Sequence, residues 1–169
     1  MGTWYALYTK SRFEKRVLSL LSKKGIEAYL PVQRFKKKWN DRFKWVEEPL
    51  FKSYLFVLVD ELKYYEALNT PGAVRYVSFN GKAAPIKHDT IDFLKRLLET
   101  EYSIEAISPN LLVGDRIQIE RGPLIGLKGT LVSFAGDKKV KVELENFEQA
   151  LLITVPMHFL QPTLETKHS

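Results

Sequence analysis

The stretch EEPLFKSYLFVLVD, residues Glu47–Asp60, holds the clearest fold signal in the chain. Its second half, Tyr54–Val59, is an unbroken apolar run, and a run of this length predicts a central strand buried on both faces. The first half is unusual for a buried strand, because Pro49 and the bulky residues after it stiffen the approach. We expect this approach to fix where Phe51 is presented, and taken by itself the segment favours a core strand.

The residues around this strand predict a mixed domain over 1–100. Trp4–Thr9 is rich in strand-forming residues, and Ser11 and Glu14 then stand at the spacing of a capping box that opens a helix. Further strands are expected over 26–35 and 73–79, and further helices over 61–68 and 89–98. The order βαββαβ followed by a helix is that of the ferredoxin-like α+β fold, an antiparallel sheet with helices on one face.

The sequence changes character after residue 100. Residues 101–109 lack a strong period and end in Ser-Pro, which predicts a linker. Residues 110–169 hold five short strand candidates separated by Gly, Asp and Asn turns, which predict a small SH3-like β-barrel. Within this domain DRIQIERGPLIGLKGTLV, Asp115–Val132, resembles the KOW motif of transcription and translation factors, whose glycines let the backbone turn between packed strands.

Charge divides the chain in the same place. The 169 residues carry a net charge of +6, but the first hundred hold 19 basic and 11 acidic residues while the remainder holds 7 and 9. A basic first domain suggests a polyanionic partner, most often nucleic acid, although basic residues can also serve solubility alone. The sequence has no cysteine, no apolar run near the length of a membrane helix and no secretory signal pattern. These features predict a cytoplasmic protein without disulfides and without a membrane partner.

Catalytic chemistry finds no support in the sequence. The three histidines, His88, His158 and His168, are not spaced as metal ligands, and no serine lies in a nucleophile elbow. GPLIGLKGT, Gly122–Thr130, looks like a phosphate loop but breaks the required Gly-Lys-Ser/Thr order, and the strand-like residues after it offer no helix N-terminus. The chain is therefore predicted not to be an enzyme and to need no metal or cofactor.

Four blocks of sequence together resemble the NusG family of transcription elongation factors. They are WYALYTKSRFEKRV, EEPLFKSYLFVLVD, TPGAVRYV and the KOW motif. Lys52-Ser53 stand where housekeeping members commonly have Pro-Gly, and the blocks look closer to specialised paralogues such as RfaH and the capsule-operon antiterminators. The resemblance implies an N-terminal domain that docks on the clamp helices of RNA polymerase and suppresses pausing or termination, and a C-terminal barrel that recruits a further partner.

The resemblance implies two sets of polymerase contacts. Tyr54 and Phe56 share one face of their strand, because successive side chains alternate, and with Tyr8 and Phe51 they would form an aromatic patch for a partner helix. The alternative is that all four rings belong to the core. The family's contact to the polymerase gate loop, across the DNA channel, corresponds to Lys63, Tyr64 and Tyr65.

The start of the first helix would face DNA. In the family this neighbourhood meets the non-template strand at the upstream fork, so the resemblance implies DNA contacts by Lys10, Arg12, Arg16, Thr70 and Arg75. Phosphate contacts of this kind fix position and make affinity depend on salt, without reading sequence. The alternative for each basic residue is a solvated helix face.

A second basic stretch is RFKKKWNDRFK, Arg34–Lys44, with six basic residues against one aspartate. Asn40-Asp41 in its middle suggests a turn, so the stretch is predicted to form the tip of a hairpin. Trp39 and Phe43 among the charges could stack on single-stranded bases. The alternative is a mobile loop of variable sequence.

In the barrel, the apolar residues Leu124, Leu127 and Phe147 are expected on loops. In NusG such residues meet a ribosomal small-subunit protein or the termination factor Rho. We expect a monomer. The rival interpretation of the whole chain is a KOW-barrel RNA-binding or ribosome-associated protein, which would bind RNA in a salt-sensitive way without polymerase.

Overall fold

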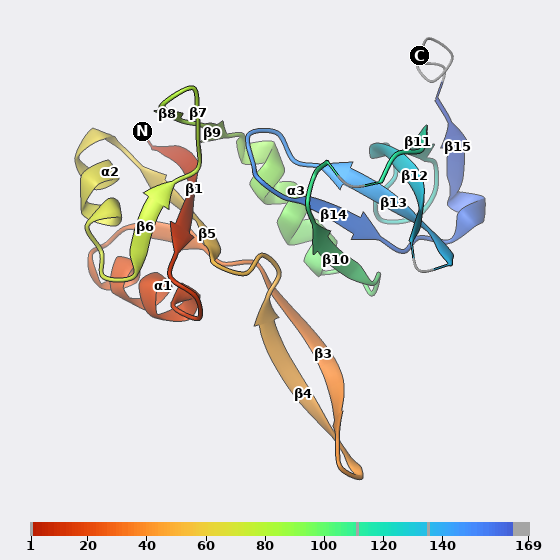
Figure 1. Ribbon diagram of the computed structural model, residues 1–169, viewed down its shortest axis with the longest axis horizontal. Coiled ribbons are helices and arrows are strands. Elements are labelled where there is room, and N and C mark those ends of the chain that lie inside the picture. The colour runs from red at the N-terminus through yellow and green to blue at the C-terminus, as the bar shows by residue number, and fades with distance from the viewer. Residues whose placement is uncertain (1, 111, 135, 164–169) are drawn as a thin grey trace. The chain divides into compact units, whose positions relative to one another are not determined.

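The computed structural model describes residues 2–110, 112–134 and 136–163 (Figure 1). The chain divides into two compact units, residues 1–98 and 99–169. We describe each unit by itself, because each has its own sheet and its own buried residues.

Unit 1 is built on a sheet in the order β2-β5-β1-β6, with β9 also paired to β1. All of these pairs are antiparallel. Strand β5 therefore lies between β1 and β2, and β1 lies between β5 and β6, which is the split-βαβ order of the expected ferredoxin-like α+β fold. The strands are β1 (Thr3–Thr9), β2 (Glu27–Tyr29), β5 (Tyr54–Val59), β6 (Ala73–Tyr76) and β9 (Pro85–Ile86).

Helices α1 (Glu14–Lys23) and α2 (Glu61–Leu68) share a core with one face of this sheet. Leu55 and Val57 of β5 belong to the same buried cluster as Leu21 of α1. The alternation expected along β5 is therefore confirmed, because Leu55 and Val57 face this cluster together.

The predicted capping box is absent at the start of α1. The N-cap residue is Phe13, whose side chain makes no capping hydrogen bond, and α1 begins at Glu14. A turn precedes the helix, in which the Phe13 N–H donates to the Lys10 carbonyl oxygen at 3.1 Å and Arg12 takes the left-handed conformation, φ 66°. Ser11 thus lies two residues before the N-cap position, too early to cap the helix.

Helix α3 (His88–Leu98) lies along the other face of the sheet. At its first residue the Trp4 indole Nε1–H donates to His88 Nδ1 at 3.2 Å. Towards its end the Lys95 ammonium lies 5.2 Å from the ring centre of Tyr29 on β2. Both contacts involve the face of the sheet that also carries Phe56, whose ring is stacked with Tyr29 at 6.5 Å.

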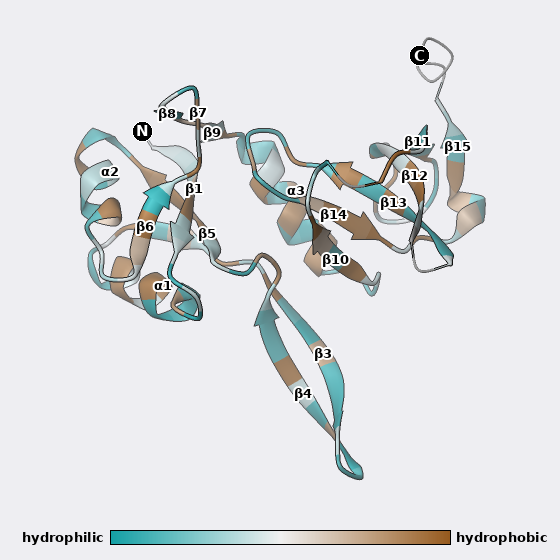
Figure 2. Cartoon of the chain, viewed as in Figure 1, coloured by the Kyte–Doolittle hydropathy of each residue, from teal (hydrophilic) through white to brown (hydrophobic). Residues whose placement is uncertain are grey.

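A long two-stranded hairpin leaves this sheet between β2 and β5 (Figure 1). Strand β3 (Val32–Trp39) pairs with β4 (Arg42–Pro49), and the backbone N–H of Leu50 donates to the Pro31 carbonyl oxygen at 2.8 Å where the hairpin begins. Figure 2 shows both strands as mainly hydrophilic, interrupted by single hydrophobic positions. A smaller hairpin, β7 (Ser78–Phe79) with β8 (Lys82–Ala83), follows β6.

Unit 2 is an antiparallel sheet in the order β10-β14-β13-β12-β11-β15. Strands β11 to β14 pair in sequence order as a meander, and β15 returns to pair with β11. This is the SH3-like arrangement expected from the sequence. Among the described residues, the outer strands β10 and β15 do not pair with each other. A 3-10 turn, Met157–Phe159, precedes β15. The strands are β10 (Ile104–Ile107), β11 (Asp115–Ile119), β12 (Lys128–Phe134), β13 (Asp137–Glu143), β14 (Ala150–Ile153) and β15 (Leu160–Pro162).

The structure differs from the expected linker at 101–109. Residues Ile104–Ile107 form strand β10, which pairs along its length with β14. In a strand of only four residues, the alternation of apolar and polar side chains is too short to be recognised from sequence. The side chain of Ile104 is buried, so this segment contributes to the core of unit 2.

Burial predicts very different costs for two phenylalanines of unit 1. Phe56 is fully buried and Phe43 on β4 is 72% exposed. We expect Phe56→Ala to lower the free energy of unfolding by about 3–5 kcal/mol and Phe43→Ala to change it by less than about 0.5 kcal/mol. Urea unfolding followed by circular dichroism measures both, and equal effects of the two substitutions would contradict the assignment of Phe56 to the core.

Candidate functional site

Basic side chains gather where β1 ends and α1 begins. Lys10, Arg12 and Arg16 are exposed, as is Arg75 on the neighbouring strand β6. The backbone holds this end together, because the Lys10 N–H donates to the Gly72 carbonyl oxygen at 2.9 Å and the strand pairing places Arg75 opposite Tyr8. Four of the five residues predicted to meet DNA therefore lie at one end of the sheet, which we call the basic end.

Thr70, the fifth predicted DNA contact, lies in the interior instead. Its side chain is 2% exposed. Its hydroxyl donates to the Glu66 carbonyl oxygen at 3.0 Å and accepts a hydrogen bond from the Lys24 ammonium at 3.0 Å. Thr70 thus ties the end of α2 to the end of α1, and it has no surface to offer to DNA in this conformation.

Tyr8 joins the basic end to the aromatic side chains of β5. The Arg75 guanidinium lies 4.9 Å from the centre of the Tyr8 ring, and the rings of Tyr8 and Tyr54 meet edge to face at 5.2 Å. Tyr8 is half-buried. A cation over an aromatic ring is stabilised by the ring quadrupole, so the Arg75 guanidinium is held against the half-buried Tyr8 ring.

The predicted aromatic patch is mostly core. Phe51 and Phe56 are 0% exposed and Tyr54 is 7% exposed. The physical reason is that Phe56 packs against the rings of Phe51 and Tyr29, on the face along which α3 lies. Of the four aromatic residues predicted to dock on a partner, only Tyr8 offers substantial surface in this conformation.

The start of α2 holds the three residues predicted to meet the gate loop. The Lys63 ammonium is directed to the Gly25 carbonyl oxygen at 3.2 Å. The ring of Tyr64 is stacked on Tyr76 at 4.3 Å, inside the unit. Tyr65 is 64% exposed, so it alone of the three projects well into solvent.

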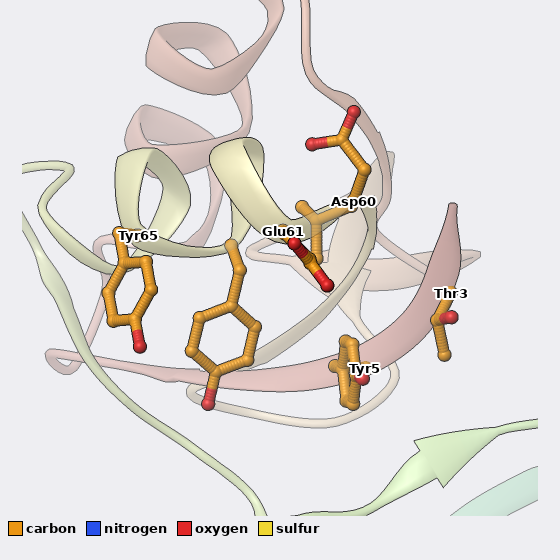
Figure 3. A pocket seen from close by; sticks show the side chains of 7 residues that line it. Thr3, Tyr5, Asp60, Glu61 and Tyr65 are labelled. Atoms are coloured by element: carbon orange, nitrogen blue, oxygen red, sulfur yellow. The ribbon is translucent and has the colours of Figure 1, made fainter. Parts of the chain in front are cut away.

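A pocket of about 480 Å³ opens beside these residues. Figure 3 shows Thr3 and Tyr5 on β1 facing the start of α2, where Asp60 caps the helix and the helix carries Glu61 and Tyr65. The pKa of Asp60 is held below its usual value, first by the hydrogen bond that its carboxylate accepts from the Lys63 N–H. The pocket therefore combines aromatic rings with carboxylates, a combination that analysis of the sequence did not identify.

Unit 2 places its predicted loop residues mostly inside. Leu124 is 4% exposed and Phe147 is 6% exposed, while Leu127 is half-buried. The loop before β12 is closed by the Gly126 N–H, which donates to the Ile119 carbonyl oxygen at 2.7 Å. This tight turn directs Leu124 inward and leaves its neighbour Ile125 67% exposed. Ile125 is an exposed apolar loop residue that the sequence did not single out.

The histidines have structural surroundings where they are described. His88 accepts the Trp4 hydrogen bond given above, and the ring of His158 meets that of Phe159 at 4.6 Å; His168 lies outside the described residues. Among residues 2–110, 112–134 and 136–163, no group of three or more His, Cys, Asp or Glu side chains is arranged to hold a metal ion. Within the same residues, each helix is too short or too polar to cross a membrane.

Comparisons with known proteins match this architecture. The family model described as "Transcription termination factor nusG" matches residues 2–95. The "Transcription termination/antitermination protein NusG" of Lactococcus lactis subsp. lactis (strain IL1403) is 24% identical over 173 residues, covering 94% of this chain and 91% of the relative. The protein of the same name from Staphylococcus carnosus (strain TM300) is 26% identical over 151 residues, covering 80% of this chain and 81% of the relative.

A solved structure shares the fold. The structure titled "Domain interaction in Thermotoga maritima NusG" superposes with a TM-score of 0.59 at 20% identity and covers 96% of this chain and 97% of its own. At this identity the likeness concerns the fold. The match to the family model extends over more than half of the chain and includes β1, the basic end and β5.

The tyrosine stack beneath α2 predicts sensitivity to alkaline pH. The Tyr76 hydroxyl donates to the Tyr64 carbonyl oxygen at 2.6 Å, and burial raises the pKa of Tyr76 well above its usual value. Because the pKa of Tyr76 is higher in the folded than in the unfolded state, its neutral hydroxyl contributes fully to the free energy of unfolding below pH about 10. As the pH rises further, the free energy of unfolding falls by up to about 1.4 kcal/mol per pH unit for one proton.

We therefore expect Tyr76→Phe to lower the free energy of unfolding by about 1 kcal/mol near neutral pH. Above pH about 10, the free energy of unfolding of this variant should fall less steeply with pH than that of wild type. Tyr65→Phe, at an exposed position of α2, is the matched control and should change neither quantity. Urea unfolding between neutral pH and about pH 11 measures both variants. An alkaline slope identical in wild type and Tyr76→Phe would show that Tyr76 is not responsible.

Proposed function

The chain belongs to the NusG family of transcription termination/antitermination factors, and we propose that it is an operon-specific elongation and antitermination factor. In this proposal unit 1 docks on the clamp helices of RNA polymerase. The bound protein holds the clamp closed around nucleic acid and biases a two-state equilibrium away from paused or terminating forms. This activity is mechanical, acts with polymerase in the cytoplasm, and requires no catalytic residue or cofactor.

The observation that carries this proposal is the junction at Tyr8. A half-buried aromatic ring, packed on Tyr54 and covered by the Arg75 guanidinium, stands at the edge of the basic end. A partner helix could bury the Tyr8 ring while nucleic acid approaches the adjacent cations. Phe51, Tyr54 and Phe56 would support Tyr8 from below rather than meet the partner themselves, because they are buried.

The basic end is proposed to touch the non-template DNA strand. Lys10, Arg12, Arg16 and Arg75 are exposed and come from adjoining segments. Arg12 and nearby Ser53 both take left-handed backbone conformations, φ 66° and 68°, and Ser53 accepts a hydrogen bond from the Thr9 N–H at 2.8 Å. Strained residues of this kind often cluster at functional sites.

Two further contacts complete the proposal. Tyr65, exposed beside the pocket at the start of α2, would reach the gate loop on the other side of the DNA channel. In unit 2 the exposed Ile125 with half-buried Leu127 would meet a ribosomal small-subunit protein or Rho, in place of the buried Leu124 and Phe147. The protein would act as a monomer.

Polymerase binding tests the docking surface. We expect the wild-type chain to retain purified bacterial core RNA polymerase in a pull-down, and Tyr8→Ala and Tyr65→Ala each to reduce retention about fivefold or more, the effect of losing about 1 kcal/mol or more at an interface. Phe79→Ala, at a 47% exposed aromatic position of β7, is the control and should bind like wild type. Unchanged retention by both tyrosine variants, with circular dichroism showing that they fold, would contradict the proposal.

Salt dependence tests the DNA contact. We expect Arg12→Ala/Arg75→Ala to lower the slope of log affinity against log salt by about 1.4 for a polymerase complex that contains a transcription bubble, since each contact to a single strand contributes about 0.7. Binding to polymerase without nucleic acid should keep its wild-type salt slope. Lys138→Ala, at an exposed position of unit 2, is the control. If the double variant kept the wild-type salt slope with the bubble-containing complex, these two arginines would not contact DNA.

A further inference from the structure

The hairpin β3–β4 exposes side chains that folding does not explain. The last six residues of β3 and the first four of β4 are exposed. Three of them carry large aromatic rings: Trp39 is 69% exposed, Phe43 is 72% exposed and Trp45 is 54% exposed. Rings of this size left in water give little core stabilisation, and grouped exposed apolar surface commonly marks a binding site.

The strand register arranges these rings among cations. Residues directly opposite each other in an antiparallel pair lie on the same face. On one face Lys36 is opposite Trp45 and Lys38 is opposite Phe43. On the other face Trp39 is opposite Arg42. Each face of the hairpin therefore presents flat apolar rings alternating with positive charges.

One cross-strand pair opposes folding of the isolated hairpin. Lys37 lies directly opposite Lys44, and like charges at such positions destabilise a sheet. Arg34–Lys44 holds six basic residues and one acidic residue, Asp41, so the remaining charges of this stretch do not neutralise the pair. A bound polyanion would relieve this repulsion, which gives the hairpin a charge-complementary occupant.

The rings also distinguish between kinds of polyanion. Trp45 has the Arg34 guanidinium at 5.0 Å and the Lys36 ammonium at 5.2 Å from its ring centre. Trp39 and Phe43 flank the turn, beside Asn40, which takes the left-handed conformation with φ 54°. Aromatic rings stack on the faces of unpaired bases, whereas in a duplex those faces are already covered by neighbouring bases.

We propose that the hairpin β3–β4 is a binding arm for single-stranded nucleic acid. Lysine and arginine side chains contact the phosphates, while Trp39 and Phe43 stack on bases. The two strands are about 27 Å long at 3.4 Å per residue, which is enough to contact several successive nucleotides. This site lies on the hairpin, separate from the basic end, and its activity needs no polymerase, so it extends beyond the proposed function.

The test measures binding of a fluorescent oligothymidylate of about 20 nucleotides to the full chain by anisotropy, over a salt series from about 50 mM. We expect Trp39→Ser/Phe43→Ser to weaken binding about tenfold or more while keeping the salt slope, since each stacked base contributes at least about a fivefold factor. Lys37→Ser/Lys44→Ser should weaken binding and lower the slope by about 1.4, two phosphate contacts. Lys82→Ser/Lys138→Ser, at exposed lysines away from the hairpin, should stay within about twofold of wild type.

Four results would overturn the proposal. They are no binding by the wild-type chain at low salt, wild-type affinity in both hairpin variants, tighter binding of the matching duplex than of the single strand, and loss of binding in Lys10→Ser/Arg12→Ser while the hairpin variants bind normally. The hairpin residues changed here are exposed, so circular dichroism should show folded variants. A failed polymerase pull-down with intact oligonucleotide binding would count against the proposed function and leave this site standing.

Discussion

The structure of unit 1 depends on strand β5 being paired on both edges and covered on both faces. It lies between β1 and β2, with the α1 cluster on one side and the rings of Phe51 and Tyr29 on the other. In this conformation every side chain of β5 except that of Leu58 is buried, so the strand leaves little surface for a partner. The surface that we propose for partners therefore lies at the end of the sheet, where Tyr8 and Arg75 meet.

The fold of unit 1 could be predicted because its signals are local. The apolar run of β5 and the order of elements sufficed for the ferredoxin-like arrangement. Exposure of the aromatic face could not be predicted, because it depends on where α3 lies, and α3 follows β5 by almost thirty residues of chain. The alternation of Tyr54 and Phe56 identifies a shared face but does not say what covers it.

Similar limits apply to single residues. Thr70 follows α2 in sequence, but its hydroxyl is bonded to Lys24 at the end of another helix. Leu124 and Ile125 are adjacent and similar, and only the turn closed by Gly126 separates an inward from an outward side chain. Ser53 is more informative. Its left-handed backbone, φ 68°, gives a physical reason for the glycine that housekeeping relatives commonly carry there, since glycine adopts this conformation without strain.

The central claim is that polymerase binds unit 1 at Tyr8, beside the basic end. Hydrogen–deuterium exchange of the full chain, with and without core RNA polymerase, locates the contact directly. The account predicts slower exchange over residues 8–16 and 73–76 in the complex, with little change over β11–β14. Protection confined to residues 99–169, or equal exchange with and without polymerase, would contradict it.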